Sequence, residues 1–267
     1  MDKLFKPTLK EFPIKELVSS LVKVQRRDDP EKFFRFFSLG TLTRSRYADL
    51  YSKEPHTLEW IESFEPGAIF WDVGANVGVY SIYAAMVSRA KVYAFEPESG
   101  NYFVLNCNIM NNGLENDVFA YCLALNDSTK KDALNMWKAG PGAGQNSFQD
   151  PLGDSGAAFK PQFRQQSMGY SADDWIKKFE AESPNYIKID VDGIEDKVLK
   201  GMPGILAMPT LFEVQVEMLE NQIEYVDSVT NLMKRAGFVL RKASSTEFTH
   251  SAVPVKNYLF SRQHPGK

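Results

Sequence analysis

The chain has 267 residues, of which 43% are hydrophobic, 24% charged and 13% aromatic, and its formal net charge is −3. This composition excludes a disordered chain, and the presence of only two cysteines, Cys107 and Cys122, excludes a disulfide scaffold. The nearly balanced charge gives no sign of a nucleic-acid-binding surface, and no apolar run is long enough for a transmembrane helix or a signal peptide. We therefore expect a globular cytoplasmic protein with two free thiols and no nucleic-acid partner.

Residues 1–55 are predicted to form a helical N-terminal extension. Apolar residues recur at helical spacing from Leu17 to Val24, and Asp29 followed by Pro30 is typical of a helix start. The second of these predicted helices carries four aromatic residues, Phe33, Phe34, Phe36 and Phe37. So dense an aromatic cluster is expected to be buried, as a lid on the main domain, in a homodimer contact or at a membrane surface.

From residue 56 to residue 267 the pattern alternates between strands and helices. Predicted strands cover residues 68–73, 91–95, 118–125, 186–191, 211–216, 238–241 and 258–260. Predicted helices cover residues 57–64, 79–88, 99–110, 194–200 and 225–236. This order predicts a parallel sheet with helices on both faces, and the last two strands, which no helix separates, are expected to be antiparallel. Residues 126–171 are glycine-rich and are predicted to be a flexible insert that holds a hairpin or two near the ligand.

A glycine loop follows the first strand of this domain. The strand ends in Asp72, and the loop that carries Gly74, Asn76 and Gly78 opens the next helix. The second strand ends just before Glu96, close to the spacing of ~20 residues at which an acid accepts hydrogen bonds from ribose hydroxyls. Because ligands of open parallel sheets bind beyond the carboxyl ends of the strands, we expect an adenosine at this edge.

The same loop disfavours other nucleotides. It lacks the middle glycine of G-x-G-x-x-G, and the chain has no P-loop motif, so a nicotinamide dehydrogenase is disfavoured. The carboxylate of Asp72 would repel a pyrophosphate but suits a ligand with an ammonium group. An adenosine joined to an amino acid describes S-adenosyl-L-methionine.

The sequence resembles the FkbM family of S-adenosylmethionine-dependent methyltransferases. The resemblance rests on FWDVGANVGVYS (70–81), VYAFEP (92–97), the spacing of Asn106 and Asn112, LALND (123–127), YIKIDVDGIEDKVLKG (186–201) and LFEVQ (211–215). The family commonly has D-V-E-G-A-E where this chain has D-V-D-G-I-E from Asp190 onward, a change that keeps every charge.

The resemblance implies a class I methyltransferase fold, which is a doubly wound, Rossmann-like α/β sheet of seven strands with the last strand antiparallel. It also implies that the methionine part of the cofactor lies near Asp72, Gly74, Asn76 and Gly78, the ribose near Glu96, and the adenine near Leu123 and Ala124. Substrate identity is not implied, because residues 1–50 and the glycine-rich insert lie outside the resemblance.

A base for methyl transfer is predicted at the carboxyl ends of the later strands. Asp190 is the first candidate, and Glu213 on the next strand is the second. Asp190, Asp192 and Glu195 offer hard oxygen ligands for Mg²⁺ or Ca²⁺, but their spacing does not match an EF-hand loop, and helix-start charge explains the last two. We expect no metal. Of the three histidines, His250 is expected at the rim of the cleft.

We therefore expect an S-adenosylmethionine-dependent methyltransferase that methylates a hydroxyl of a sugar or glycoconjugate. A lipid, a peptide or a natural product is an alternative acceptor. A protein with the methyltransferase fold that binds without catalysis is the alternative of a different class.

Overall fold

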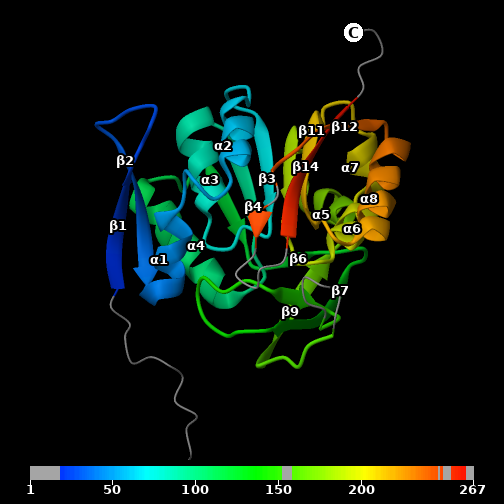
Figure 1. Ribbon diagram of the computed structural model, residues 1–267, viewed down its shortest axis with the longest axis horizontal. Helices are drawn as coiled ribbons and strands as arrows, with labels where there is room; N and C mark the ends of the chain where they lie inside the picture. The colour runs from blue at the N-terminus through cyan, green and yellow to red at the C-terminus, as the bar shows by residue number, and fades with distance from the viewer. Residues whose placement is uncertain (1–18, 152–157, 246, 249–253, 263–267) are drawn as a thin grey trace, which may run out of the picture.

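The computed structural model describes residues 19–151, 158–245, 247–248 and 254–262, and it is built around one large sheet (Figure 1). The order of its strands is β12-β14-β11-β10-β3-β4-β5, with β13 paired to β14. These strands are β3 (Ile69–Val73), β4 (Lys91–Phe95), β5 (Val118–Tyr121), β10 (Tyr186–Ile189), β11 (Glu213–Leu219), β12 (Phe238–Ala243), β13 (Glu247–Phe248) and β14 (Pro254–Arg262). Adjacent main strands are parallel except at β14, which is antiparallel to both β11 and β12. The predicted seven-stranded order with an antiparallel last strand is confirmed.

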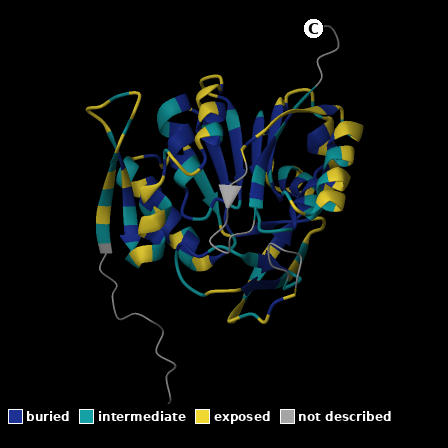
Figure 2. Cartoon of the chain, in the orientation of Figure 1, coloured by how far each residue is buried: buried dark blue, intermediate teal, exposed yellow. Residues whose placement is uncertain are grey.

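Helices cover both faces of the sheet (Figure 1). One face carries α2 (Pro55–Glu62), α3 (Val79–Tyr83), the π-helical turn η2 (Ala84–Ser88) and α4 (Ser99–Asn112), and the other carries α5 (Ala172–Phe179), α6 (Glu195–Lys200), α7 (Pro203–Ala207) and α8 (Ile223–Arg235). A separate apolar core lies on each face. Figure 2 shows the central strands buried between them, including the polar residues Asp72 and Lys188.

The helical prediction for the N-terminal extension is wrong over most of its described part. Strands β1 (Ser19–Gln25) and β2 (Phe33–Leu39) form an antiparallel hairpin, and only α1 (Gly40–Ala48) is helical before α2. The side chains of Phe34 and Phe36 are fully buried while their neighbours in β2 are not, so burial in this strand has a period of two residues, not 3.6. Leu17, where the predicted first helix begins, lies outside the described residues.

The hairpin packs on the main domain. Phe36 stacks on Tyr47 of α1 with ring centroids 4.4 Å apart, and both side chains belong to the core that contains α3 and α4. Two asparagines of α4 extend this contact, because Asn108 and Asn112 accept hydrogen bonds from backbone amides of β2 at 2.6 and 2.9 Å. Among the interpretations of the aromatic cluster, packing on the main domain is confirmed.

The glycine-rich insert contributes most of a second sheet. Its order is β6-β9-β7-β8, with β6 (Ala124–Leu125), β7 (Lys130–Met136), β8 (Asn146–Phe148) and β9 (Phe163–Tyr170). The antiparallel pairs of β7 with β8 and β9 confirm the predicted hairpins. The second sheet lies against the edge at which β3, β4 and β10 end (Figure 1).

Two general expectations can be compared with this fold. Cys107 and Cys122 are both free thiols, as expected. None of the described helices combines the length and the apolar character that crossing a membrane requires.

Candidate functional site

A cavity opens where β3, β4 and β10 end, between the large sheet and the second sheet. Five of the seven residues predicted to bind the cofactor line it, namely Gly74, Asn76, Glu96, Leu123 and Ala124. Asp190, the first candidate for the base, lines the same cavity. The structure therefore brings together, in one cavity, residues that the sequence placed at the ends of four different strands.

Two glycines shape the loop after β3. Gly74 has a φ of +86°, and a Cβ at this position would lie 1.8 Å from the carbonyl oxygen of Asp190, so the loop can pass the end of β10 only with glycine here. Gly78 has a φ of +81°, and its Cβ would lie 2.2 Å from a methyl group of Leu105. Gly78 therefore allows α3 to pack closely on α4, and it does not line the cavity.

Glu96 is a buried acid at the cavity wall. Its Oε2 accepts a hydrogen bond from the backbone N–H of Asn76 at 2.7 Å, and its Oε1 accepts one from the N–H of Glu98 at 2.8 Å. Burial raises the pKa of the Glu96 carboxyl to about 7, although these hydrogen bonds lower it. The Oε1 also receives a longer hydrogen bond of 3.5 Å from the amide of Asn101, so it is Oε2 that can accept a further hydrogen bond from a ribose hydroxyl.

Asp72 is not on the cavity wall, where the sequence had placed it. Its side chain is buried beneath the loop and accepts a hydrogen bond from the Ser81 hydroxyl at 2.5 Å. Burial raises the pKa of Asp72, while the ammonium group of Lys188 on the adjacent strand lowers it.

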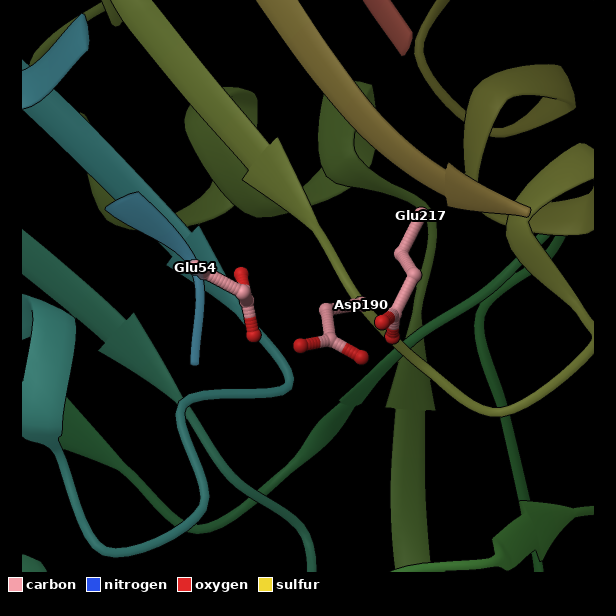
Figure 3. A group of neighbouring side chains, drawn as sticks. All are labelled: Glu54, Asp190 and Glu217. Carbon is pink, nitrogen blue, oxygen red and sulfur yellow. The ribbon is translucent and has the colours of Figure 1, made fainter. Parts of the chain in front are cut away.

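Three carboxylates from distant parts of the chain converge beside the cavity (Figure 3). Glu54 is the residue just before α2, Asp190 follows β10, and Glu217 lies in β11. Each offers a carboxylate oxygen that lies within 4.8 Å of the other two. Two ammonium groups are bound here, since Lys188 Nζ lies 2.6 Å from Asp190 Oδ2 and Lys53 Nζ lies 2.8 Å from Glu54 Oε1.

The charges in this group determine which acid is ionised. Burial opposes ionisation of Asp190, but the Lys188 ammonium and a hydrogen bond with Glu217 hold the pKa of Asp190 well below its usual range. Burial and the Asp190 charge raise the pKa of Glu217 far above its usual value. Two carboxyl groups this close do not both ionise, so the shared proton resides on Glu217 and Asp190 remains a carboxylate.

Glu213, the second candidate for the base, is not part of this group. It is the first residue of β11, and it accepts hydrogen bonds at 2.7 Å from Trp60, Arg241 and Ser261. The strand extends beyond its predicted end, so Glu217, four residues later on the same face, reaches the edge that carries Asp190. The structure thus corrects the assignment: Glu213 lies at the opposite end of the strand from the cavity.

Asp192 and Glu195 form hydrogen bonds outside the three-carboxylate group that contains Asp190. The Oδ2 of Asp192 accepts hydrogen bonds from the backbone N–H groups of residues 145 and 146 at 2.7 and 3.2 Å. Glu195 accepts hydrogen bonds from the N–H of Gly193 at 2.9 Å and from the Tyr225 hydroxyl at 2.6 Å. Within the described part of the chain, the carboxylates close enough to share an ion belong to the group in Figure 3. His250 lies outside the described residues.

The family was identified by comparison with known proteins. The model of the methyltransferase FkbM domain matches residues 72–240. The chain belongs to the FkbM methyltransferase family. This match confirms the resemblance seen in the sequence, and it supports the expected class of enzyme, which uses S-adenosyl-L-methionine as methyl donor.

Individual relatives of this FkbM domain are distant. The hexuronic acid methyltransferase AglP of Haloferax volcanii is 25% identical over 173 residues, which are 64% of this chain and 65% of the relative. The structure of an S-adenosylmethionine-dependent methyltransferase from Agrobacterium tumefaciens aligns with a TM-score of 0.53 at 11% identity, over 93% of this chain and 72% of that chain. A precorrin-6y C5,15-methyltransferase from Geobacter metallireducens aligns with a TM-score of 0.48 at 10% identity, over 79% and 87%. The alignment with the Agrobacterium protein confirms the class I fold.

Sequence reasoning missed the residues by which the insert closes the cavity of this FkbM domain. The side-chain amides of Asn76 and Asn101 donate to the carbonyl oxygen of Ala143 at 2.9 and 3.2 Å, and Asn101 accepts a hydrogen bond from Gly142 N–H at 2.7 Å. No local pattern links residue 101 to residue 143. Glu54 was missed for the same reason, whereas Glu217 could have been found, because it continues the face of Glu213 along its strand.

Proposed function

We propose that this FkbM-family protein methylates a hydroxyl of a sugar or glycoconjugate, with Asp190 as the base. The observation that carries the proposal is the Asp190 carboxylate, which lines the cofactor cavity and is kept ionised by the buried Lys188. The sugar acceptor is supported by the hexuronic acid methyltransferase among the relatives. A lipid, a peptide or a natural product is the alternative acceptor.

The residues of the chain have separate tasks in this reaction. S-adenosyl-L-methionine supplies an electrophilic methyl group on a sulfonium when it is bound. Glu96 accepts hydrogen bonds from the ribose, and the loop at Gly74 approaches the methionine part. Asp190 accepts a hydrogen bond from the acceptor hydroxyl and takes its proton as the oxygen–methyl bond forms and the sulfur–methyl bond breaks. Because positioning supplies most of the rate, a weakly basic carboxylate is sufficient.

Two expectations from the sequence remain predictions beside this proposal. One is a homodimer through the N-terminal segment. The other is a cytoplasmic location.

The substitution Asp190→Asn tests the proposed base. We expect methyl transfer to a sugar acceptor to fall about 100-fold, because a positioned base contributes 10²-fold or more to such a step. Binding of S-adenosylhomocysteine, measured by calorimetry, should change by less than about threefold, since Asn preserves the shape of the side chain.

Glu213→Gln is the matched control, because it changes a buried carboxylate at the other end of β11 and should retain methyl transfer. Full transfer by Asp190→Asn would exclude Asp190 as the base. If the wild-type protein failed to bind S-adenosylhomocysteine, the proposal of an enzyme would give way to that of a protein that has the fold without the activity.

A further inference from the structure

A second cavity adjoins the cofactor cavity. Its lining residues are Asp192, Gly193, Glu195, Glu217, Met218, Leu219, Gln222, Tyr225 and Val255. Asp192 lines both cavities, and the carboxylates of Asp190 and Glu217 meet between them. The second cavity therefore gives an acceptor a way to reach the group that holds Asp190 while the cofactor fills the first.

We propose that this second cavity is the acceptor subsite and that it selects an uncharged sugar ring over a hexuronate. This inference rests on the proposed function and names the class of substrate for the same site. On this inference, the protein differs in its preferred acceptor from AglP, whose name specifies a hexuronic acid as its substrate.

The lining of the second cavity suits a sugar ring. Met218, Leu219 and Val255 form a buried apolar wall, and the half-buried ring of Tyr225 adds an aromatic surface. The Tyr225 hydroxyl is held in place, because it donates to Glu195 at 2.6 Å and accepts from the N–H of Asp196 at 3.1 Å. An apolar wall with a few fixed polar groups is the usual construction of a small-molecule site, and here the carboxyl groups can bind sugar hydroxyls.

The charges around the cavity oppose a carboxylate on the ligand. No described lysine or arginine is among the residues that line it, whereas Asp192, Glu195 and Glu217 are. The lysines nearest the three-carboxylate group are already engaged, since Lys188 binds Asp190 and Lys53 binds Glu54. Of the three acids in the wall, Glu217 holds the shared proton and burial raises the pKa of Glu195 to about 7, which leaves the carboxylate of Asp192 as the negative charge that faces a ligand. A hexuronate would therefore place its carboxylate beside that of Asp192 and find no lysine or arginine among the described residues of the cavity wall, and such a like-charge contact disfavours the ligand.

Matched pairs of sugars test this selectivity. The protein saturated with S-adenosylhomocysteine is titrated in a calorimeter with the methyl glycosides of glucose, galactose and mannose, and with the corresponding methyl uronosides, which differ only by the carboxylate. We expect at least one neutral glycoside to bind, and to bind at least about tenfold more tightly than its uronoside. Equal or tighter binding of the uronosides, or no binding of any of the six sugars, would overturn the inference.

The substitution Asp192→Asn tests the origin of the selectivity. Asp192 has a φ of +57°, a conformation that asparagine tolerates well, and the amide oxygen can still accept from the loop N–H groups. Loss of this charge should reduce the preference for the neutral sugar by about threefold to tenfold. Asp117→Asn is the control, because it makes the same charge change at an exposed residue near the amino end of β5.

The two proposals fail in different ways. If Asp192→Asn leaves the preference unchanged, the charge of this cavity does not select the acceptor. If the protein binds S-adenosylhomocysteine and methylates uronosides in preference to neutral sugars, the inference fails and the proposed function stands. If it methylates no sugar, the proposed function fails.

Discussion

At the scale of single residues, Glu96 shows how burial tunes an acid without a nearby counter-charge. The residue is 5% exposed, and the donors to its carboxyl group are backbone N–H groups and the amide of Asn101. The pKa of about 7 follows from the loss of hydration, which these donors only partly replace. The side chain of Asp190 is 22% exposed, and the ammonium group of Lys188 shifts the pKa of Asp190 in the opposite direction.

Cofactor affinity should therefore depend on pH through Glu96. Ribose hydroxyls donate hydrogen bonds, so they bind the ionised carboxylate, and the ionised fraction increases as the pH rises through about 7. We expect the affinity for S-adenosylhomocysteine to increase roughly tenfold between about pH 6 and pH 8, as measured by calorimetry. Glu96→Gln should bind more weakly, with a flat profile over this range. A flat wild-type profile, or an unchanged slope in the variant, would assign the titration to another group.

The same shift has the opposite effect on the stability of the protein without cofactor. The pKa of Glu96 in the folded state lies above its usual value, so the unfolded chain ionises first as the pH rises. The contribution of this group to the free energy of unfolding is therefore present below its usual pKa and is lost as the pH rises towards about 7. Binding and stability thus favour opposite protonation states of one side chain.

At the scale of elements, the hairpin β1-β2 shows the limit of local periodicity. Phe33, Phe34, Phe36 and Phe37 fit a helical stripe about as well as a strand, because four aromatic residues in five positions satisfy both periods. The backbone forms a strand because β1 pairs with β2 over its whole length and α4 receives the buried face. The sequence of residues 33–37 alone does not indicate that β1 and α4 pack against this segment.

The packing of the hairpin predicts a large effect for Phe36→Ala. The side chain is fully buried and stacks on Tyr47, so its removal should lower the free energy of unfolding by about 3–5 kcal/mol in a urea titration. Leu21→Ala on the neighbouring strand is the control, because Leu21 is 49% exposed, and it should cost less than about 1 kcal/mol. If the two variants lowered the free energy of unfolding by the same amount, the packing of the hairpin would add little to the stability of the domain.

At the scale of the whole molecule, the cofactor cavity is assembled from three parts of the chain. The large sheet supplies the loop at Gly74 and Glu96, and the second sheet supplies Leu134 and Phe148. Helix α1 supplies Arg46, whose guanidinium donates to the carbonyl oxygen of Gly142 at 3.0 Å. Closure of the cavity therefore depends on contacts between elements that are far apart in sequence.

Gly142→Ala should disturb this closure. The φ of Gly142 is +86°, and a Cβ there would lie 2.7 Å from the backbone nitrogen of Thr43 in α1, so the insert loop must move away. We expect the affinity for S-adenosylhomocysteine to fall about tenfold, because strain of this kind costs ~1–3 kcal/mol. Gly140→Ala is the control for backbone strain without a steric contact. Gly140 has a φ of +137°, but no atom lies within 4 Å of the added Cβ. If both variants lost a similar amount of affinity for S-adenosylhomocysteine, the contact between the insert loop and α1 would not be needed for cofactor binding.

The sequence by itself determined the large sheet, its antiparallel last strand and the loop from Asp72 to Glu96. These features depend on short-range patterns, namely apolar runs between turn signals, glycines that allow a left-handed backbone, and an acid at a set distance along one βαβ unit. They were sufficient to indicate the cofactor and its class of enzyme.

Only the tertiary structure decided which acids meet Asp190, how the insert closes the cavity and where the N-terminal strands pair. Glu54, Asp190 and Glu217 are brought together by strand order and by the docking of α2, and Asn101 meets Ala143 only after the second sheet has packed. Such contacts arise from the burial of apolar faces that are distant in the chain, so they leave no local pattern. The protonation of the site depends on them, because burial and a neighbouring lysine, not residue type, set the pKa of each acid.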